Sequence, residues 1–147
     1  MMMKLQNFLE CRMKILVDTH ILVWLHTADK RLSKKAISIL SDINNTIYYS
    51  TVSIWESEIK HNLHPKDFAF SGIELERLSN LADLRNLPIE SKHVFNINKL
   101  KYSKKSKKDH KDPFDKMLIS QAKTEGMFLL THDELIQNYL EECIIFV

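Results

Sequence analysis

Short apolar runs alternate along the chain with longer segments in which apolar residues recur every three or four positions. The runs are rich in β-branched and aromatic residues, which is typical of strands, whereas the wider spacing indicates helices with one buried face. Strands that alternate with helices favour βαβ units and a parallel sheet, so the fold class is α/β. The pattern predicts strands at residues 14–18, 46–51, 84–89, 127–131 and 143–147.

Capping residues mark where the helices begin and end. Ser33 is placed to cap one helix, and Ser53 to cap another that ends before Pro65, because the residue before a proline is disfavoured in the helical region. Asp112-Pro113 opens a further helix, which Gly126 ends. Other helical segments are predicted around residues 21–25, 75–82 and 90–100, and from about residue 133.

Length and composition indicate one globular domain. The 147 residues are 44% hydrophobic and 27% charged, enough for one substantial core. No run of about 18 apolar residues is present, so no membrane span is expected. Two cysteines form no disulfide framework, which fits a reducing, cytoplasmic location. Residues 1–12 have no signal-peptide pattern and are expected to be an upstream extension or the result of a mis-set start, ahead of a domain at 13–147.

Positive charge is concentrated in one segment. Residues 99–111 contain seven lysines and one aspartate, a local charge of +6, which leaves 14 basic and 18 acidic residues elsewhere, or −4. One interpretation is a solvated loop that serves solubility. The other is a basic segment that binds a polyanion and leads it to an acidic site.

Two acidic residues directly follow strands. Asp18 ends the first apolar run and Asp133 follows the fourth. In open parallel sheets, ligand sites gather outside the carboxyl ends of the strands, where these side chains would converge. Each acid also has a purely structural interpretation, as an Asx turn or a helix N-cap.

Two more acids lie on predicted helices, and each has a structural alternative. The spacing of Ser53 and Glu56 matches a capping box. Asp112 as N-cap and Asp115 in the first turn match an ordinary helix start. Taken together, however, the four acids predict a carboxylate cluster, which is costly unless it holds a divalent cation.

Four segments carry a resemblance to a known family. They are LVDTH at residues 16–20, STVSIWE at 50–56 with Ile59-Lys60 after it, HKDPFDKMLISQA at 110–122 and LTHD at 130–133. In their order and spacing, residues 13–147 resemble PIN-domain ribonucleases, in particular the toxins of virulence-associated type II toxin–antitoxin pairs. Many relatives have arginine or another residue where this chain has His132.

The resemblance implies a three-layer fold in which helices flank a central parallel sheet of strand order 3-2-1-4-5. It implies that Asp18, Glu56, Asp115 and Asp133 form the catalytic site and bind Mg²⁺ or Mn²⁺, with Asp112 peripheral. We expect Asp18 and Asp115 to be direct ligands, and Glu56 and Asp133 to hold water molecules of the ion or a second ion. The sequence leaves one ion or two open.

The resemblance also implies the activity and the partners. It implies a metal-dependent endoribonuclease that acts as a toxin, forms a homodimer and is inhibited by a small antitoxin that inserts a segment into the acidic groove. Contacts with the RNA backbone would give affinity without base specificity. The residues expected to make them are Thr19, Lys104, Lys105, Lys107, Lys108 and His110.

Two alternatives have different chemistry. A non-catalytic RNA- or partner-binding module of the same fold would bind without cleaving. A phosphotransfer enzyme would need a second aspartate where His20 stands, or a phosphoacceptor aspartate at the end of the strand at 84–89, and neither is present. Four other histidines are expected to be at the surface or partly buried, without chemical roles: His26, His61, His64 and His93.

Overall fold

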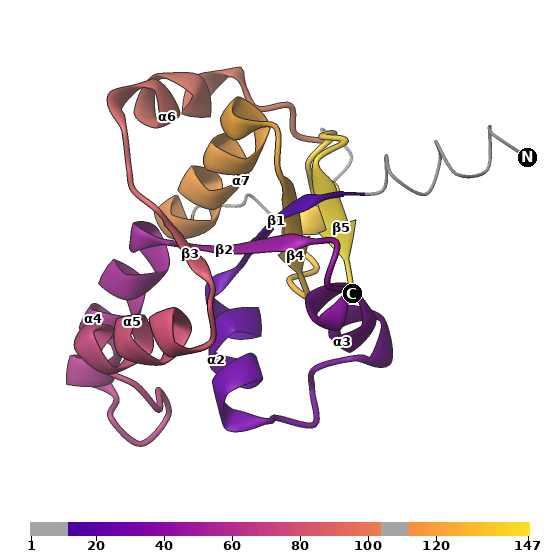
Figure 1. Cartoon of the computed structure of the whole chain (residues 1–147). Helices are drawn as coiled ribbons and strands as arrows, with labels where there is room; N and C mark the ends of the chain where they lie inside the picture. The colour runs from indigo at the N-terminus through magenta and orange to yellow at the C-terminus, as the bar shows by residue number, and fades with distance from the viewer. Residues whose placement is uncertain (1–11, 104–111) are drawn as a thin grey trace, which may run out of the picture.

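A five-stranded parallel sheet forms the centre of the protein (Figure 1). The computed structural model describes residues 12–103 and 112–147. The strand order, β3-β2-β1-β4-β5, is the one expected from the resemblance, and every strand lies within two residues of its predicted position. The strands are β1 (Lys14–Val17), β2 (Thr46–Ser50), β3 (Arg85–Leu87), β4 (Phe128–Thr131) and β5 (Ile144–Phe146).

Helices connect the strands and cover both faces of the sheet, which confirms the three-layer prediction (Figure 1). None of the helices in the described ranges is long and apolar enough to cross a membrane. The α-helices are α2 (Thr19–Thr27), α3 (Lys34–Ser41), α4 (Thr51–Leu63), α5 (Gly72–Leu81), α6 (Ser91–Asn96) and α7 (Pro113–Glu125), and the 3-10 turns are η1 (Ile97–Lys99) and η2 (Ile136–Asn138).

Strand β1 is buried on both faces and divides the core in two. Ile15 and Val17 pack with α2, α3 and α5 on one side of the sheet, whereas Leu16 packs with α7 on the other. A continuous apolar run suits such a strand, because neither of its faces meets water. Figure 1 shows α2 and α3 below the sheet and α6 and α7 above it.

The chain reverses direction across the sheet at β1. It passes from β1 to β2 and β3 on one side and returns through α7 to β4 and β5 on the other. The carboxyl ends of β1 and β4 therefore border the topological switch point, where sites form in open α/β sheets. The pairing of Val17 with Leu130 brings the residues that follow these strands side by side.

The buried side chain of His93 ties α6 to α7. Its Nδ1 accepts the Glu90 N–H at 3.0 Å, and its Nε2 lies 2.7 Å from Glu125 Oε1. The Ser120 hydroxyl donates to the His93 carbonyl at 2.5 Å. The expectation of a surface or partly buried histidine is wrong here, since His93 is fully buried.

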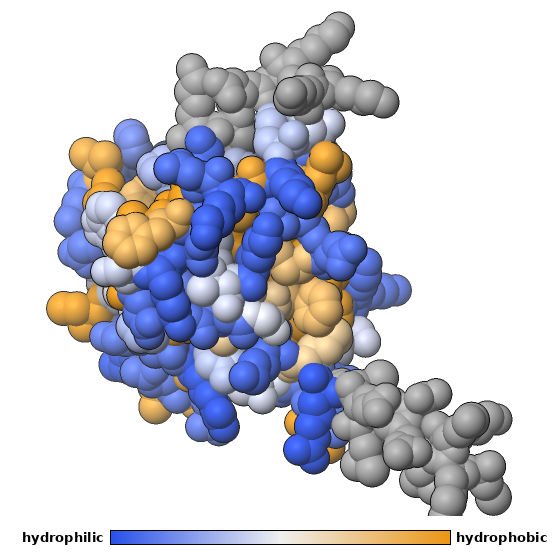
Figure 2. All heavy atoms as spheres, turned by 90° about the horizontal axis from the view of Figure 1, so that it is seen from above, coloured by the Kyte–Doolittle hydropathy of each residue, from blue (hydrophilic) through white to orange (hydrophobic). Residues whose placement is uncertain are grey.

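On the face around α6, Figure 2 shows hydrophobic side chains in separate patches among hydrophilic ones.

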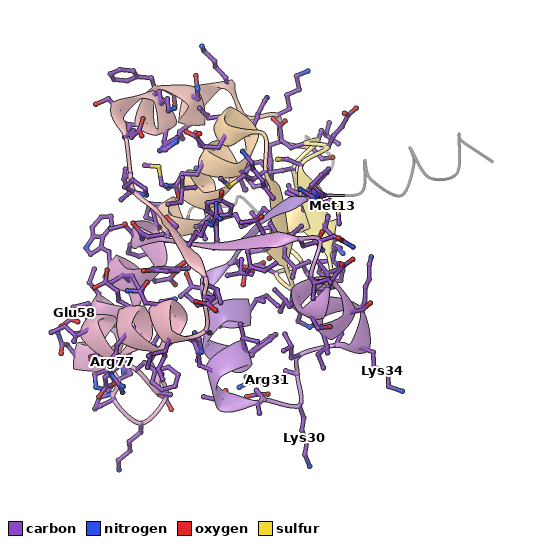
Figure 3. The ribbon with its side chains drawn as sticks, in the orientation of Figure 1. Met13, Lys30, Arg31, Lys34, Glu58 and Arg77 are labelled. Carbon is purple, nitrogen blue, oxygen red and sulfur yellow. The ribbon has the colours of Figure 1, made fainter. Side chains whose placement is uncertain are left out.

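A glycine lets α5 approach α4 closely. The Gly72 N–H donates to Glu58 Oε2 at 2.7 Å, and a Cβ at Gly72 would lie 3.1 Å from the Ile54 carbonyl oxygen. Glu58 projects from α4 in Figure 3. Because a backbone atom lies on one side of this space, a larger residue would push the two helices apart.

Ala28 has a backbone conformation that favours glycine, and Ala28→Gly is expected to stabilise the protein. Its φ of 50° and ψ of 42° at the end of α2 are left-handed. Relief of the Cβ clash outweighs the greater unfolded-state entropy of glycine by roughly 0.5–1 kcal/mol. Urea unfolding measures the difference. Gly126→Ala, at φ 65°, is the reverse control and is expected to destabilise, and equal stability of Ala28→Gly and wild type would contradict the prediction.

Candidate metal centre

Asp18 is both a helix cap and the end of a strand. Its Oδ1 accepts the Ile21 N–H at 2.8 Å, which caps α2, and its Oδ2 accepts the Thr131 hydroxyl. The side chain is buried. Burial raises the pKa of Asp18, and the nearby Asp133 raises it further, while the bonds from Thr131 and Ile21 oppose the shift. The structural alternative is thus confirmed without excluding a functional role.

Thr131 connects the two acids at the switch point. Its buried hydroxyl donates to Asp18 Oδ2 and accepts the Asp133 N–H at 3.0 Å. Asp133 Oδ1 then accepts the Leu135 N–H at 2.8 Å, which is an Asx turn. The helix predicted from residue 133 is only the single turn η2. The sequence alone did not predict a role for Thr131. The feature that could have indicated it is a hydroxyl side chain two residues before Asp133.

Glu56 is buried on α4, and one of its oxygens has no partner. The residue is 2% exposed; Oε2 accepts from Lys60 Nζ, and Oε1 has no hydrogen bond among the described atoms. Buried polar atoms are almost always hydrogen-bonded, so an unsatisfied carboxylate oxygen indicates a ligand position.

The capping-box interpretation of Glu56 is wrong, because α4 begins earlier than predicted. Ser50, not Ser53, is the N-cap, and its hydroxyl accepts the Val52 N–H at 3.0 Å. The same Ser50 hydroxyl donates to Gln121 Oε1 at 2.5 Å, which fixes the end of β2 against α7. Glu56 therefore lies in the second helical turn, where it has no capping role.

Asp115 brings the acids into one cluster. It lies in the first turn of α7, where Asp112 Oδ1 accepts the N–H groups of Phe114 and Asp115 at 2.9 and 3.1 Å. Burial raises the pKa of Asp115 from 3.8 to about 8. Further contributions come from the negative charges nearby, which are those of Asp112, Asp133, Glu56 and Asp18. Asp112 is the N-cap, as the structural alternative predicted.

Comparison with known proteins identifies the family. A family model described as PIN domain matches residues 15–140. The chain belongs to the PIN-domain family. PIN domains are generally nucleases and typically use divalent metal ions. A search of curated proteins found no match.

Two solved structures share this fold at a TM-score of 0.50 or more, and a third matches below that level. A chain from VapBC2 of Rickettsia felis, bound to a DNA fragment from their promoter, has a TM-score of 0.63 at 18% identity, over 92% of this chain and 98% of that one. A domain of a functionally unknown Methanocaldococcus jannaschii protein has a TM-score of 0.50 at 16% identity, over 92% and 91%. A chain of FitAB bound to an IR36 DNA fragment has a TM-score of 0.48 at 19% identity, over 81% of this chain and 85% of that one.

The donor set of this PIN domain fits a hard divalent cation. All four acids offer carboxylate oxygens, the ligands that Mg²⁺ and Mn²⁺ prefer, and Glu56 Oε1 is free to accept. Within the described ranges, no three His, Cys, Asp or Glu side chains are grouped closely enough to hold an ion by themselves. Water would therefore have to complete the ligand set of an ion held here, and Mg²⁺ retains several waters when it binds to proteins.

Aromatic side chains pack beside the acidic cluster. Trp24 is buried between His20 and His132, with ring centroids 6.1 and 5.5 Å away. The guanidinium of Arg31 lies 4.9 Å from the Trp24 ring centroid, and Figure 3 shows Arg31 on the loop after α2. Trp24 is a packing residue here, because its ring is enclosed by its neighbours.

Of the residues predicted to contact RNA, the structure describes Thr19. Its buried hydroxyl donates to Ser53 Oγ at 2.9 Å and joins α2 to α4 next to Asp18 in the chain. This position favours support of the centre over contact with a substrate. The basic candidates lie outside the described residues: Lys104, Lys105, Lys107, Lys108 and His110.

Proposed function

We propose that this PIN domain is an endoribonuclease that hydrolyses RNA phosphodiester bonds with Mg²⁺ or Mn²⁺ and acts as the toxin of a toxin–antitoxin pair. The observation that carries the proposal is that Asp18, Glu56 and Asp133 lie near enough to the half-buried Asp115 for their charges to add to the effect of burial, which raises its pKa. A buried cluster of like charges is unfavourable by itself and becomes favourable around a cation. Membership of a family of nucleases supports the same activity.

In this proposal Asp18 and Asp115 hold the ion directly, and Glu56 and Asp133 act through water. When bound, the ion neutralises the phosphate oxygens and lowers the pKa of the water that attacks phosphorus. Glu56 Oε1 has no hydrogen-bond partner among the described residues, so it would be able to accept a hydrogen bond from a water molecule at the centre and orient it. Thr131 keeps Asp18 in place, and the Asx turn does the same for Asp133.

The proposed partners are RNA, an antitoxin and a second copy of the chain. The lysine-rich segment and His110 would contact RNA phosphates, since such contacts give affinity without base specificity. The sequence resemblance to virulence-associated toxins and the structural likeness to a VapBC2 chain support an antitoxin that covers the acidic groove. The homodimer rests on the sequence resemblance alone.

Asp18→Asn tests the proposed activity. The amide oxygen can still accept the Ile21 N–H, so the cap on α2 is kept while a charged ligand is lost. We expect RNA cleavage with Mg²⁺ or Mn²⁺ to fall by roughly a hundredfold or more, growth arrest to disappear, and RNA binding to persist. Cleavage products on a gel and cell growth after induction measure these effects.

Asp67→Asn is the matched control, because it makes the same change at an exposed position and should leave cleavage unchanged. Undiminished cleavage by Asp18→Asn would contradict the site assignment. A wild-type protein that binds RNA but cuts none with either ion would favour the non-catalytic module instead.

A further inference from the structure

The ammonium group of Lys60 pairs with one acid of the cluster, Glu56. Lys60 follows Glu56 by one helical turn on α4, and its Nζ forms an ion pair with Glu56 Oε2. The same Nζ lies 5.6 Å from the ring centroid of Phe68. Lys60 is 34% exposed, whereas Glu56 is 2% exposed, so the lysine reaches inward from the rim to a buried carboxylate.

This ion pair differs from an ordinary pair on a helix surface. Exposed pairs of this spacing contribute little, because water solvates both charges. Here the carboxylate is enclosed, and its charge is close enough to raise the pKa of Asp115. Removing one partner of such a pair leaves an uncompensated buried charge. Lys60 is therefore the charged partner of the buried Glu56 carboxylate.

The segment that follows α4 holds the Lys60 ammonium in position. His61 Nδ1 lies 2.7 Å from the Phe68 carbonyl oxygen, and the Ser57 hydroxyl donates to the Phe70 carbonyl at 2.7 Å. These bonds hold the segment after α4 against the helix, so the Phe68 ring stays beside the ammonium. A cation over an aromatic ring is stabilised by the electrons of the ring face.

We propose that Lys60 supplies the second positive charge of the centre, so that the chain binds one divalent ion and not two. The inference rests on the proposed function and identifies how its acids are neutralised. A second ion would have to approach Glu56 beside the ammonium, where like charges repel. Lys60 is thus a positioning residue: it holds Glu56 through Oε2, and Oε1 has no hydrogen-bond partner among the described residues and would be available to the single ion or its water.

Counting bound Mn²⁺ tests the inference without RNA or cleavage. Calorimetric titration of the full chain with Mn²⁺ should give one ion per wild-type chain. Lys60→Met, which keeps much of the side-chain volume without the charge, should bind a second Mn²⁺, and Glu56→Gln in the same chain should remove it. Lys60→Arg should restore a count of one. Lys66→Met removes an equal charge at an exposed position and should also bind one ion.

Two Mn²⁺ ions bound to the wild type would overturn the inference and leave the proposed function intact. This measurement needs only the wild type, so it tests the inference even if Lys60→Met does not fold. A folded Lys60→Met that binds one ion, with wild-type or weaker affinity, would also overturn it, because Lys60 would then only support Glu56. A wild-type chain that binds no Mn²⁺ would overturn the proposed metal dependence as well. Circular dichroism establishes whether each variant is folded.

Discussion

Asp115→Asn is expected to lower RNA cleavage by on the order of a thousandfold and, without divalent ions, to stabilise the folded protein at neutral pH. The loss follows because a direct ligand of the proposed ion becomes neutral. The gain follows because burial and four neighbouring acids make the charged form of Asp115 unfavourable, so the folded wild type must keep Asp115 protonated, whereas the amide is neutral and needs no proton. Opposite effects on activity and stability are typical of a residue whose position serves function.

The stabilising effect of Asp115→Asn should depend on pH in a defined direction. Because the pKa of Asp115 is raised from 3.8 to about 8, the folded protein keeps a proton that the unfolded chain has released. Between about pH 4 and 8 the stability of the metal-free wild type therefore falls as the pH rises. The contribution across this window is on the order of a few kcal/mol. Urea unfolding in EDTA at pH 5 and pH 8 measures it.

Asp112→Asn is the matched control on the same helix. Asparagine is a good N-cap, so the helix start is kept and most of the cleavage should remain. If Asp115→Asn cleaved RNA like the wild type, Asp115 would not be a ligand. If its stability fell between pH 5 and pH 8 as steeply as that of the wild type, Asp115 would not be the group that titrates.

Thr131→Val is the second change with a large expected effect. Valine has nearly the same shape but removes the donor to Asp18 and the acceptor for the Asp133 N–H. Since these groups are buried, stability should fall by about 1–3 kcal/mol. Cleavage should fall roughly 10–100-fold, as for other residues that orient metal ligands. Urea unfolding and initial cleavage rates measure the two effects.

Mn²⁺ binding distinguishes this role from a loss of packing. The Thr131 hydroxyl lowers the pKa of Asp18, so its removal should shift Mn²⁺ binding to higher pH. Thr131→Ser keeps the hydroxyl and should keep the wild-type pH dependence, although it loses a methyl group. A pH dependence of Thr131→Val that matches the wild type would show that Thr131 does not orient the ligand.

The sequence was sufficient for features that depend on neighbours along the chain. Buried strands give continuous apolar runs, and the caps at Asp18 and Asp112 accept N–H groups two or three residues ahead. The strand order could not be predicted in this way, and its prediction came from the family resemblance and not from periodicity. The structure confirms that order.

Features that depend on distant neighbours were missed. Ser50 and Ser53 are equally good caps by composition, and the contact of Ser50 with Gln121 on α7 is one that the sequence does not show. His93 is buried because Glu125, 32 residues away, binds its ring. In the sequence, Lys60 is only part of a motif. The positioning role proposed for it depends on the burial of Glu56, which the sequence does not show.

The double role of Asp18 has a consequence for how the proposed ion would be captured. Each carboxylate oxygen already has one hydrogen bond, from Ile21 to Oδ1 and from Thr131 to Oδ2, so the side chain cannot rotate freely. Each oxygen still keeps a second lone pair for a ligand. The rotational freedom of this ligand is therefore lost when the protein folds and not when the ion arrives. Capture then needs little reorganisation at Asp18, which favours tighter binding.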